Sequence, residues 1–334
     1  MIDTYIREET QSGDALIRRD SMSSIARIDG IIFDVDGVLI DVGESIQLVH
    51  KEAAGRFFGA LGWTNCDHLV EPEDVDAFKL AGGFNSDWNL AFAWMLLYLF
   101  KSARHGATDG GVLRSREPMI GDFAAGLSKR GGYLESAVGA IREMCRPDEW
   151  EAIASKWDRP GLQRMFQEVY SGDLCREVYG FEPEIVTGAG LVRRDRPILD
   201  RRFLPPVKLG IATGRTAGET IVGMRLMGWD DVFPPSSIVS EDDGFLKPDP
   251  RILALAVERL GAKTPMYIGD TPDDLLTVKR YNEDYGPMLA CMVQTGLRGS
   301  NGDGADMIAS DVNAALIAVN QCIGGTLCPD EKQR

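Results

Sequence analysis

The fold is decided by the stretch Ile31-Ile32-Phe33-Asp34-Val35-Asp36-Gly37-Val38-Leu39-Ile40-Asp41. An apolar run that ends at a turn residue is typical of a buried strand, so we expect a strand that ends near the two carboxylates. If the strand continued through both, Asp34 and Asp36 would point to the same face, because side chains alternate along a strand. Two carboxylates in such a place are costly unless a cation or a proton compensates them. Taken alone, the stretch fits equally well a strand that runs into an acidic surface loop.

Composition narrows the class of protein. The chain has 334 residues, of which 44% are hydrophobic, and its net charge is −15. No apolar run approaches the roughly 18 residues of a membrane span, and the first residues do not resemble a secretory signal. The negative charge disfavours a nucleic-acid or anionic-membrane partner. Six scattered cysteines without a Cys/His cluster argue against a zinc site or a disulfide framework, and we expect a cytoplasmic protein.

The spacing of apolar and polar residues changes along the chain. Residues 1–28 are polar without a clear period, and we expect a loosely packed or disordered N-terminal extension. From residue 44 to about 179 the apolar spacing is helical, which predicts a helical block over 44–195. Within it, residues 104–132 are rich in Gly, Ser, Arg and Asp and are expected to form a flexible loop.

The remainder alternates strands and helices. Apolar runs at 207–212, 237–240, 266–269 and 288–294 are each followed by a helical pattern. Such alternation predicts an α/β fold with a parallel sheet covered on both faces. The strand at Ile31 belongs to that sheet, so the predicted core comprises residues 29–43 and 196–334, and the helical block is an insertion into it.

Four polar clusters follow predicted strands. They are Asp34 with Asp36, Thr213-Gly214-Arg215, Lys247-Pro248-Asp249-Pro250, and Gly269-Asp270-Thr271-Pro272-Asp273-Asp274. In open α/β sheets ligands bind beyond the carboxyl ends of the strands. Carboxylates, a hydroxyl with backbone amides, and an ammonium are the groups needed to hold a divalent cation beside a phosphate.

At these residues the chain resembles the haloacid dehalogenase superfamily, in its phosphatase-like subfamily with a helical cap of the first (C1) type. The resemblance rests on four motifs in order, DVDGV, IATGR, KPDP and GDTPDD. It implies a Rossmann-like core interrupted by the cap, in agreement with the pattern of strands and helices.

The resemblance also implies roles for individual residues. Asp34 would be the nucleophile that attacks phosphorus, and Asp36 the general acid and base. Thr213 and the backbone of Gly214 would bind phosphate oxygens, and Lys247 would neutralise charge on phosphate and nucleophile.

A Mg²⁺ cofactor is implied as well. Its ligands would be Asp34, the main-chain carbonyl of Asp36, and Asp270, while Asp274 or, less favoured, Asp273 would hold metal-bound water. The physical reason is independent of the family, because a carboxylate that attacks a phosphate dianion is repelled unless a cation lies between the two charges.

Structural alternatives stand beside these roles. The Thr213-Gly214-Arg215 cluster also reads as a helix-capping turn, and Arg215 is expected to contact either the substrate or only the helix. Thr271-Pro272-Asp273-Asp274 is also a good helix start, with Thr as N-cap and Pro at the first position.

In the helical block, the stretch from Lys79 to Trp88 carries a double glycine and several polar groups. We expect Asn85, Asp87 and Trp88 to read the substrate's leaving group. The alternative is a turn between two helices with Trp88 in the core of the cap.

Together these features predict a Mg²⁺-dependent phosphatase that hydrolyses a small phosphorylated metabolite through an aspartyl-phosphate. A phosphosugar mutase of the same superfamily and a catalytically silent regulatory module are the alternatives. Asp36 argues against dehalogenation, which needs no acid for the leaving group. The substrate and the oligomeric state are left open by the sequence.

Overall fold

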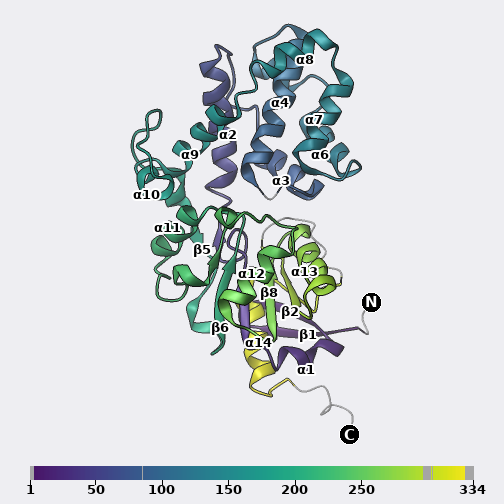
Figure 1. Ribbon diagram of the computed structural model, residues 1–334, viewed down its shortest axis with the longest axis vertical. Coiled ribbons are helices and arrows are strands. Elements are labelled where there is room, and N and C mark those ends of the chain that lie inside the picture. Colours follow the sequence, from purple (N-terminus) through teal and green to yellow (C-terminus); the bar gives the residue numbers. More distant parts are fainter. Residues whose placement is uncertain (1–3, 85, 296–301, 303, 328–334) are drawn as a thin grey trace. The chain divides into compact units, whose positions relative to one another are not determined.

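The computed structural model describes residues 4–84, 86–295, 302 and 304–327. The chain divides into two compact units (Figure 1). One contains the residues up to Asp41 and those from Arg196 onward, and the other spans Val42–Asp195. The expected boundaries at residues 43 and 195 lie within two residues of this division.

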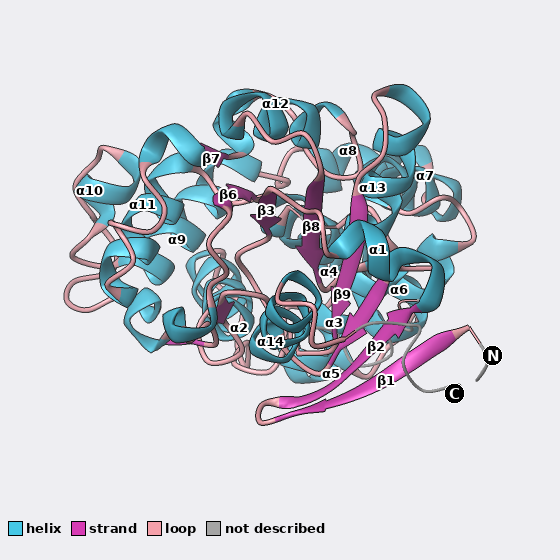
Figure 2. Cartoon of the chain, turned by 90° about the horizontal axis from the view of Figure 1, so that it is seen from below, coloured by secondary structure: helices cyan, strands magenta, loops and turns pink. Residues whose placement is uncertain are grey.

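The first unit is built on a mixed sheet with the strand order β1-β2-β10-β9-β8-β3-β6-β7 among the described residues (Figure 2). All neighbours from β10 to β7 are parallel, whereas β1 and β2 are antiparallel additions at one edge. The strands of this sheet are β1 (Tyr5–Thr10), β2 (Gly13–Arg18), β3 (Gly30–Phe33), β6 (Lys208–Ala212), β7 (Ile238–Val239), β8 (Pro265–Gly269), β9 (Leu289–Val293) and β10 (Met307–Ala309). The predicted α/β class is confirmed.

The central strands are fully buried because helices cover the sheet. Strand β3 lies between β6 and β8, and all four of its residues are buried. An apolar run without alternation is what a strand covered on both faces requires. The helices of this unit are α1 (Met22–Ile25), α11 (Ala217–Met227), α12 (Arg251–Leu260), α13 (Pro272–Asp284) and α14 (Val312–Ile323), with short 3₁₀ turns at Arg19–Ser21, Arg201–Phe203, Pro235–Ser237 and Glu241–Asp243.

The N-terminal residues differ from expectation. Instead of a loose extension, β1 and β2 form a hairpin, and β2 pairs with β10 over Met307–Ala309. Ala15 and Ile17 alternate with more exposed neighbours and are completely buried. The hairpin is therefore part of the core sheet.

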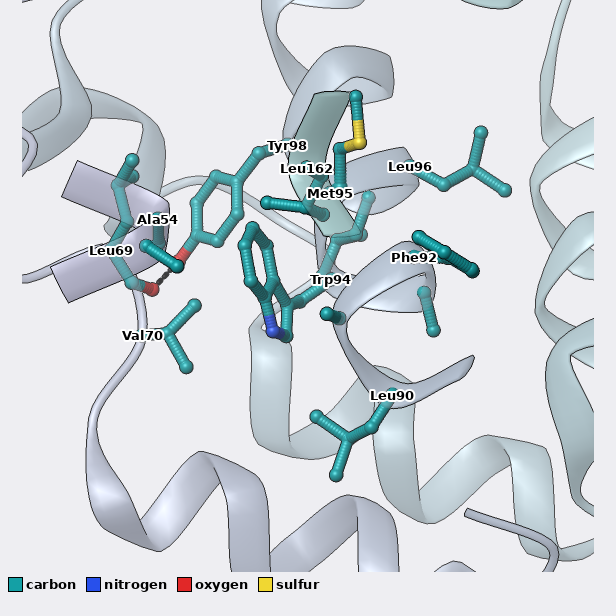
Figure 3. Packing of buried hydrophobic residues seen from close by; sticks show 14 of the residues in the cluster. Ala54, Leu69, Val70, Leu90, Phe92, Trp94, Met95, Leu96, Tyr98 and Leu162 are labelled. Atoms are coloured by element: carbon teal, nitrogen blue, oxygen red, sulfur yellow. Dashed lines mark hydrogen bonds between the residues drawn. The ribbon is translucent and has the colours of Figure 1, made fainter. Parts of the chain in front are cut away.

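The second unit is helical. Its helices are α2 (Ile46–Ala60), α3 (Pro72–Ala81), α4 (Asp87–His105), α5 (Gly110–Arg114), α6 (Ile120–Ser128), α7 (Tyr133–Met144), α8 (Pro147–Ala154), α9 (Arg159–Ser171) and α10 (Cys175–Tyr179), followed by a 3₁₀ turn at Leu191–Arg194. Helix α4 is buried on all sides from Leu90 to Lys101, as its apolar sequence requires. Figure 3 shows the centre of this core, where Trp94 packs beside Tyr98 and the Tyr98 hydroxyl donates to the carbonyl of Leu69.

The segment 104–132 also differs from expectation, because it contains α5 and α6 rather than only a flexible loop. Asp109 caps α5 by accepting from the Val112 N–H at 2.9 Å. Leu113, Phe123 and Leu127 are buried in the core of the unit. Phe123 and Leu127 are four residues apart, as on one face of a helix, but the polar residues around them concealed that pattern.

The chain leaves and re-enters the first unit through a two-stranded ribbon. Strand β4 (Ile40–Asp41) pairs antiparallel with β5 (Arg196–Pro197), so Asp41 lies opposite Arg196. This pairing brings together the two chain segments that flank the insertion.

Candidate active site

The first acidic motif follows β3 directly. The Asp34 N–H donates to the Ile268 carbonyl at 2.9 Å, after which the chain turns sharply. The N–H groups of Leu39 and Ile40 both donate to the Val35 carbonyl, and Gly37 has a φ of 73°, a conformation that glycine adopts without strain. Strand β3 therefore ends at Phe33, and the turn, rather than strand alternation, orients the two carboxylates.

A lysine from far along the chain meets the first carboxylate. The Lys247 ammonium lies 2.7 Å from Asp34 Oδ2 and 2.6 Å from Asp274 Oδ1. All three residues are buried. The other oxygen of Asp34, Oδ1, accepts from the Val35 N–H at 2.8 Å.

Asp274 organises the turn after β8. Its Oδ2 accepts from the N–H groups of Asp270 and Thr271 and from the Thr271 hydroxyl, and its Oδ1 accepts from Lys247 and from the Tyr267 hydroxyl. Thr271 in turn caps α13, so the predicted helix start is present. A Cβ atom on Gly269 would lie 2.5 Å from the Asp274 Cβ, so only glycine allows this approach.

Burial and charge shift the pKa values of this cluster in opposite directions. Burial, opposed by Lys247, raises the pKa of Asp34 to about 6. Burial also acts to lower the pKa of Lys247, but its ion pairs with Asp274 and Asp34 outweigh that and raise it. For Asp274, burial is outweighed by Lys247, and its pKa is lowered. Lys247 is thus a permanent cation in a buried acidic site.

The motif after β6 lies at the neighbouring strand end. Thr213 is 1% exposed, and its hydroxyl accepts from the Arg215 N–H at 3.2 Å, with Gly214 half-buried between them. The helix cap is not Thr213 but Thr216, which forms a capping box with Glu219. The Arg215 guanidinium donates to Asp36 Oδ1 from Nε at 2.8 Å and from Nη2 at 2.5 Å. The Arg215 guanidinium thus contacts the helix, as one of the two alternatives has it, and also pairs with Asp36, which the sequence did not indicate.

Three carboxylates at this edge of the sheet are close enough to share an ion. Asp34, Asp270 and Asp274 are buried, and one oxygen from each lies within 4.8 Å of the others. Oxygen donors from carboxylates are the ligands that Mg²⁺ prefers.

The family comparison agrees with this arrangement. A model of the haloacid dehalogenase-like hydrolases matches residues 28–282. The chain belongs to this family. The predicted haloacid dehalogenase fold and the prediction of a hydrolase are thereby confirmed.

Two solved structures and one curated protein illustrate the breadth of the likeness. Phosphatase Tt82 from Thermococcus thioreducens is 28% identical, with a TM-score of 0.57 over 89% of this chain and 99% of that one. A haloacid dehalogenase-superfamily hydrolase of subfamily IA from Geobacter sulfurreducens is 14% identical, with a TM-score of 0.42 over 88% of this chain and 96% of that one. An imidazoleglycerol-phosphate dehydratase from Phytophthora nicotianae is 25% identical over 255 residues, which are 76% of this chain but only 41% of that protein.

The part of this hydrolase that the structure describes contains no helix long and apolar enough to cross a membrane.

The expected leaving-group residues of the helical unit have other partners. Trp88 is 8% exposed and packs edge-on against Phe166, so the structure favours the alternative in which it belongs to the core. Asp87 pairs with Lys79 at 3.5 Å and accepts from His50 Nε2 at 3.1 Å. Asn85 lies outside the described residues.

Two polar residues of this hydrolase were missed from sequence. His50 is completely buried, and its Nδ1 accepts from the Trp94 indole N–H at 3.2 Å, so its own proton is on Nε2, toward Asp87. Lys79 and His50 outweigh burial and lower the pKa of Asp87 to about 2. The other is Tyr267, whose hydroxyl joins Lys247 and Asp274. Its position next to the Ile268-Gly269-Asp270 strand end was the available signal.

Proposed function

We propose that this hydrolase is a Mg²⁺-dependent phosphatase that cleaves a small phosphorylated metabolite through an aspartyl-phosphate on Asp34. The observation that carries the proposal is the buried Asp34–Lys247–Asp274 cluster beside Asp270, at the carboxyl ends of adjacent parallel strands. A cation already paired with the attacking carboxylate lessens its repulsion by a phosphate dianion.

In the first step an oxygen of Asp34 attacks phosphorus, and the bond from phosphorus to the ester oxygen breaks. Asp36 gives a proton to the departing oxygen, which leaves as an alcohol. In the second step Asp36, now a carboxylate, takes a proton from water as the water oxygen attacks phosphorus. This releases inorganic phosphate and restores Asp34.

Lys247 and Thr213 act on the phosphoryl group in this scheme. Lys247 is also held by Asp274, at 2.6 Å, so its charge stays in place through both steps. Thr213 follows β6, the neighbour of β3, and would donate its hydroxyl proton to a phosphoryl oxygen, beside the Gly214 amide.

The carboxylates also fit a metal ion. Asp34 and Asp270, with the main-chain carbonyl of Asp36, would hold Mg²⁺, and when bound the ion would neutralise charge between nucleophile and phosphate. Asp274 is better suited to holding Lys247, because both of its oxygens already accept from protein donors.

The test is phosphate release from a panel of phosphorylated metabolites and p-nitrophenyl phosphate, with Mg²⁺ present. Wild type should release phosphate, and Asp34→Asn should lose at least about a thousandfold in rate, since it removes the nucleophile. Asp231→Asn, an equal change of charge at an exposed residue, should keep full activity. Release by Asp34→Asn at the wild-type rate would refute the proposal.

A further inference from the structure

The proposed acid and base, Asp36, is held by the arginine Arg215. Two N–H groups of Arg215 converge on one oxygen, Oδ1, from Nε at 2.8 Å and from Nη2 at 2.5 Å. The Asp36 side chain is 24% exposed, whereas that of Arg215 is 5% exposed. The carboxylate is thus the more exposed partner, and the arginine is the buried one.

The arginine is fixed from several directions. The main-chain N–H of Arg215 donates to the Thr213 hydroxyl at 3.2 Å, and its main-chain carbonyl accepts from the Glu241 N–H at 2.9 Å. Its guanidinium lies against α11 at Gly223, where a Cβ atom would come within 3.1 Å of Nη1. A glycine at this position of the helix leaves the space that the guanidinium occupies.

We propose that Arg215 is a positioning residue for proton transfer by Asp36. Arg215 donates two hydrogen bonds to Oδ1 of Asp36 and so fixes the orientation of the carboxyl group. The other oxygen, Oδ2, then carries the proton that goes to the departing ester oxygen. The inference rests on the proposed function and deepens it, because it assigns Arg215 to Asp36 and not to the substrate.

Leaving-group chemistry separates this role from a structural one. An alkyl alcohol is a poor leaving group and needs a proton as the phosphorus–oxygen bond breaks, whereas p-nitrophenolate leaves without one. A misplaced Asp36 therefore slows alkyl esters selectively. The ratio kcat/KM reports only the steps up to the first irreversible one, formation of the aspartyl-phosphate, so the second role of Asp36 does not obscure the comparison.

The experiment measures kcat/KM for p-nitrophenyl phosphate and for the best alkyl phosphate of the wild-type panel. Arg215→Ala should lose about a hundredfold on the alkyl ester, the usual contribution of a positioned proton donor, and only a few-fold on the aryl ester. Arg215→Lys, which keeps the charge but not the paired N–H groups, should show a smaller loss with the same selectivity. If Arg215→Ala does not fold, Arg215→Lys alone tests the proposed role.

Two further variants complete the design. Asp36→Asn should show the same selectivity, and Arg215→Ala added to it should cost nothing more, because both act on one proton transfer. Arg225→Ala, a change of an exposed arginine on α11, the helix that follows Arg215, should leave kcat/KM for both substrates unchanged.

The outcomes distinguish the inference from the function on which it rests. If wild type hydrolyses neither ester, the proposed function fails and the inference with it. If wild type hydrolyses both and Arg215→Ala and Arg215→Lys slow both equally, the phosphatase stands and only the role of Arg215 is refuted. A loss confined to the alkyl ester supports the role.

Discussion

Lys101 is an unusual residue, because it is completely buried in the helical unit. Its ammonium donates to the Leu113 carbonyl at 3.1 Å and lies 5.2 Å from the centre of the Tyr98 ring. Burial, followed by the nearby charge of Arg114, lowers its pKa to about 8, against weaker opposite effects of Glu117 and Asp74. Keeping this lysine protonated at neutral pH therefore costs the folded state free energy.

This predicts a pH dependence of stability. In the unfolded chain Lys101 keeps its proton up to a pKa of about 10.4, whereas in the folded chain it loses it near 8. Between these values the unfolded state binds more protons, so stability rises with pH. Relative to Lys101→Met, the wild-type free energy of unfolding should rise by about 2 kcal/mol from pH 7 to 10, measured in urea.

The matched control is Lys129→Met, which removes an exposed lysine of the same unit. The difference in free energy of unfolding between Lys129→Met and wild type should stay constant from pH 7 to 10. If the difference in free energy of unfolding between Lys101→Met and wild type were also constant, Lys101 would titrate normally despite its burial.

At the same scale, the sequence indicated which residues of the candidate site lie near one another, but not every side-chain pairing among them. Asp34, Lys247 and Asp270 could be brought together because each follows a strand, and the carboxyl ends of parallel strands share an edge. The pairing of Arg215 with Asp36 could not be foreseen, since it depends on a side-chain direction set by the turn after β6. Tyr267 was hidden because its neighbours make the strand look purely apolar.

Among the elements, the N-terminal hairpin is joined to the core more firmly than its polar sequence indicates. The Ser12 hydroxyl donates to Asp311 Oδ2 at 2.8 Å, and Asp311 is the N-cap of α14. Gly13 approaches Ser310 so closely that a Cβ atom would lie 2.7 Å from the Ser310 Cβ. Ile17, opposite Met307 on β10, contributes a fully buried side chain.

Replacing Ile17 by alanine should therefore destabilise the whole first unit. We expect a loss of about 2–4 kcal/mol in the free energy of unfolding, the usual cost of deleting a buried aliphatic side chain. Glu9→Ala, on the exposed side of β1, should cost less than about 0.5 kcal/mol. If the two variants were equally stable, the hairpin would be a dispensable extension.

Elements were predictable where their pattern was strong. The apolar strands β3, β6, β8 and β9 and the helix α13, with its Thr-Pro start, were found from sequence. The hairpin, β10 and α5 were not, because each is short or carries many charged or polar neighbours. Pairing with a neighbour, rather than local propensity, stabilises such elements.

At the scale of the whole molecule, the fold is an α/β core with a helical insertion, and the chain segments on either side of the insertion pair as β4 and β5. The spacing of apolar residues indicated the insertion, because a helical pattern begins near residue 44 and strands alternating with helices follow only after about residue 196. The charge of −15 belongs to the whole chain, yet the buried acids gather at one edge of the sheet. We therefore expect a divalent cation to bind specifically at that edge and weakly elsewhere.

Thermal melting separates these two kinds of binding. If Asp34 and Asp270 hold Mg²⁺, the ion binds only the folded protein and should stabilise it by about 2.7 kcal/mol at a hundredfold excess over its dissociation constant. The melting temperature of wild type should rise accordingly, and that of Asp270→Asn should not. Asp231→Asn removes an exposed charge and should keep the full rise, and NaCl at equal ionic strength should not reproduce it. A rise that survives in Asp270→Asn would place the ion on the acidic surface of the molecule instead, because only general attraction to a chain of charge −15 would then remain.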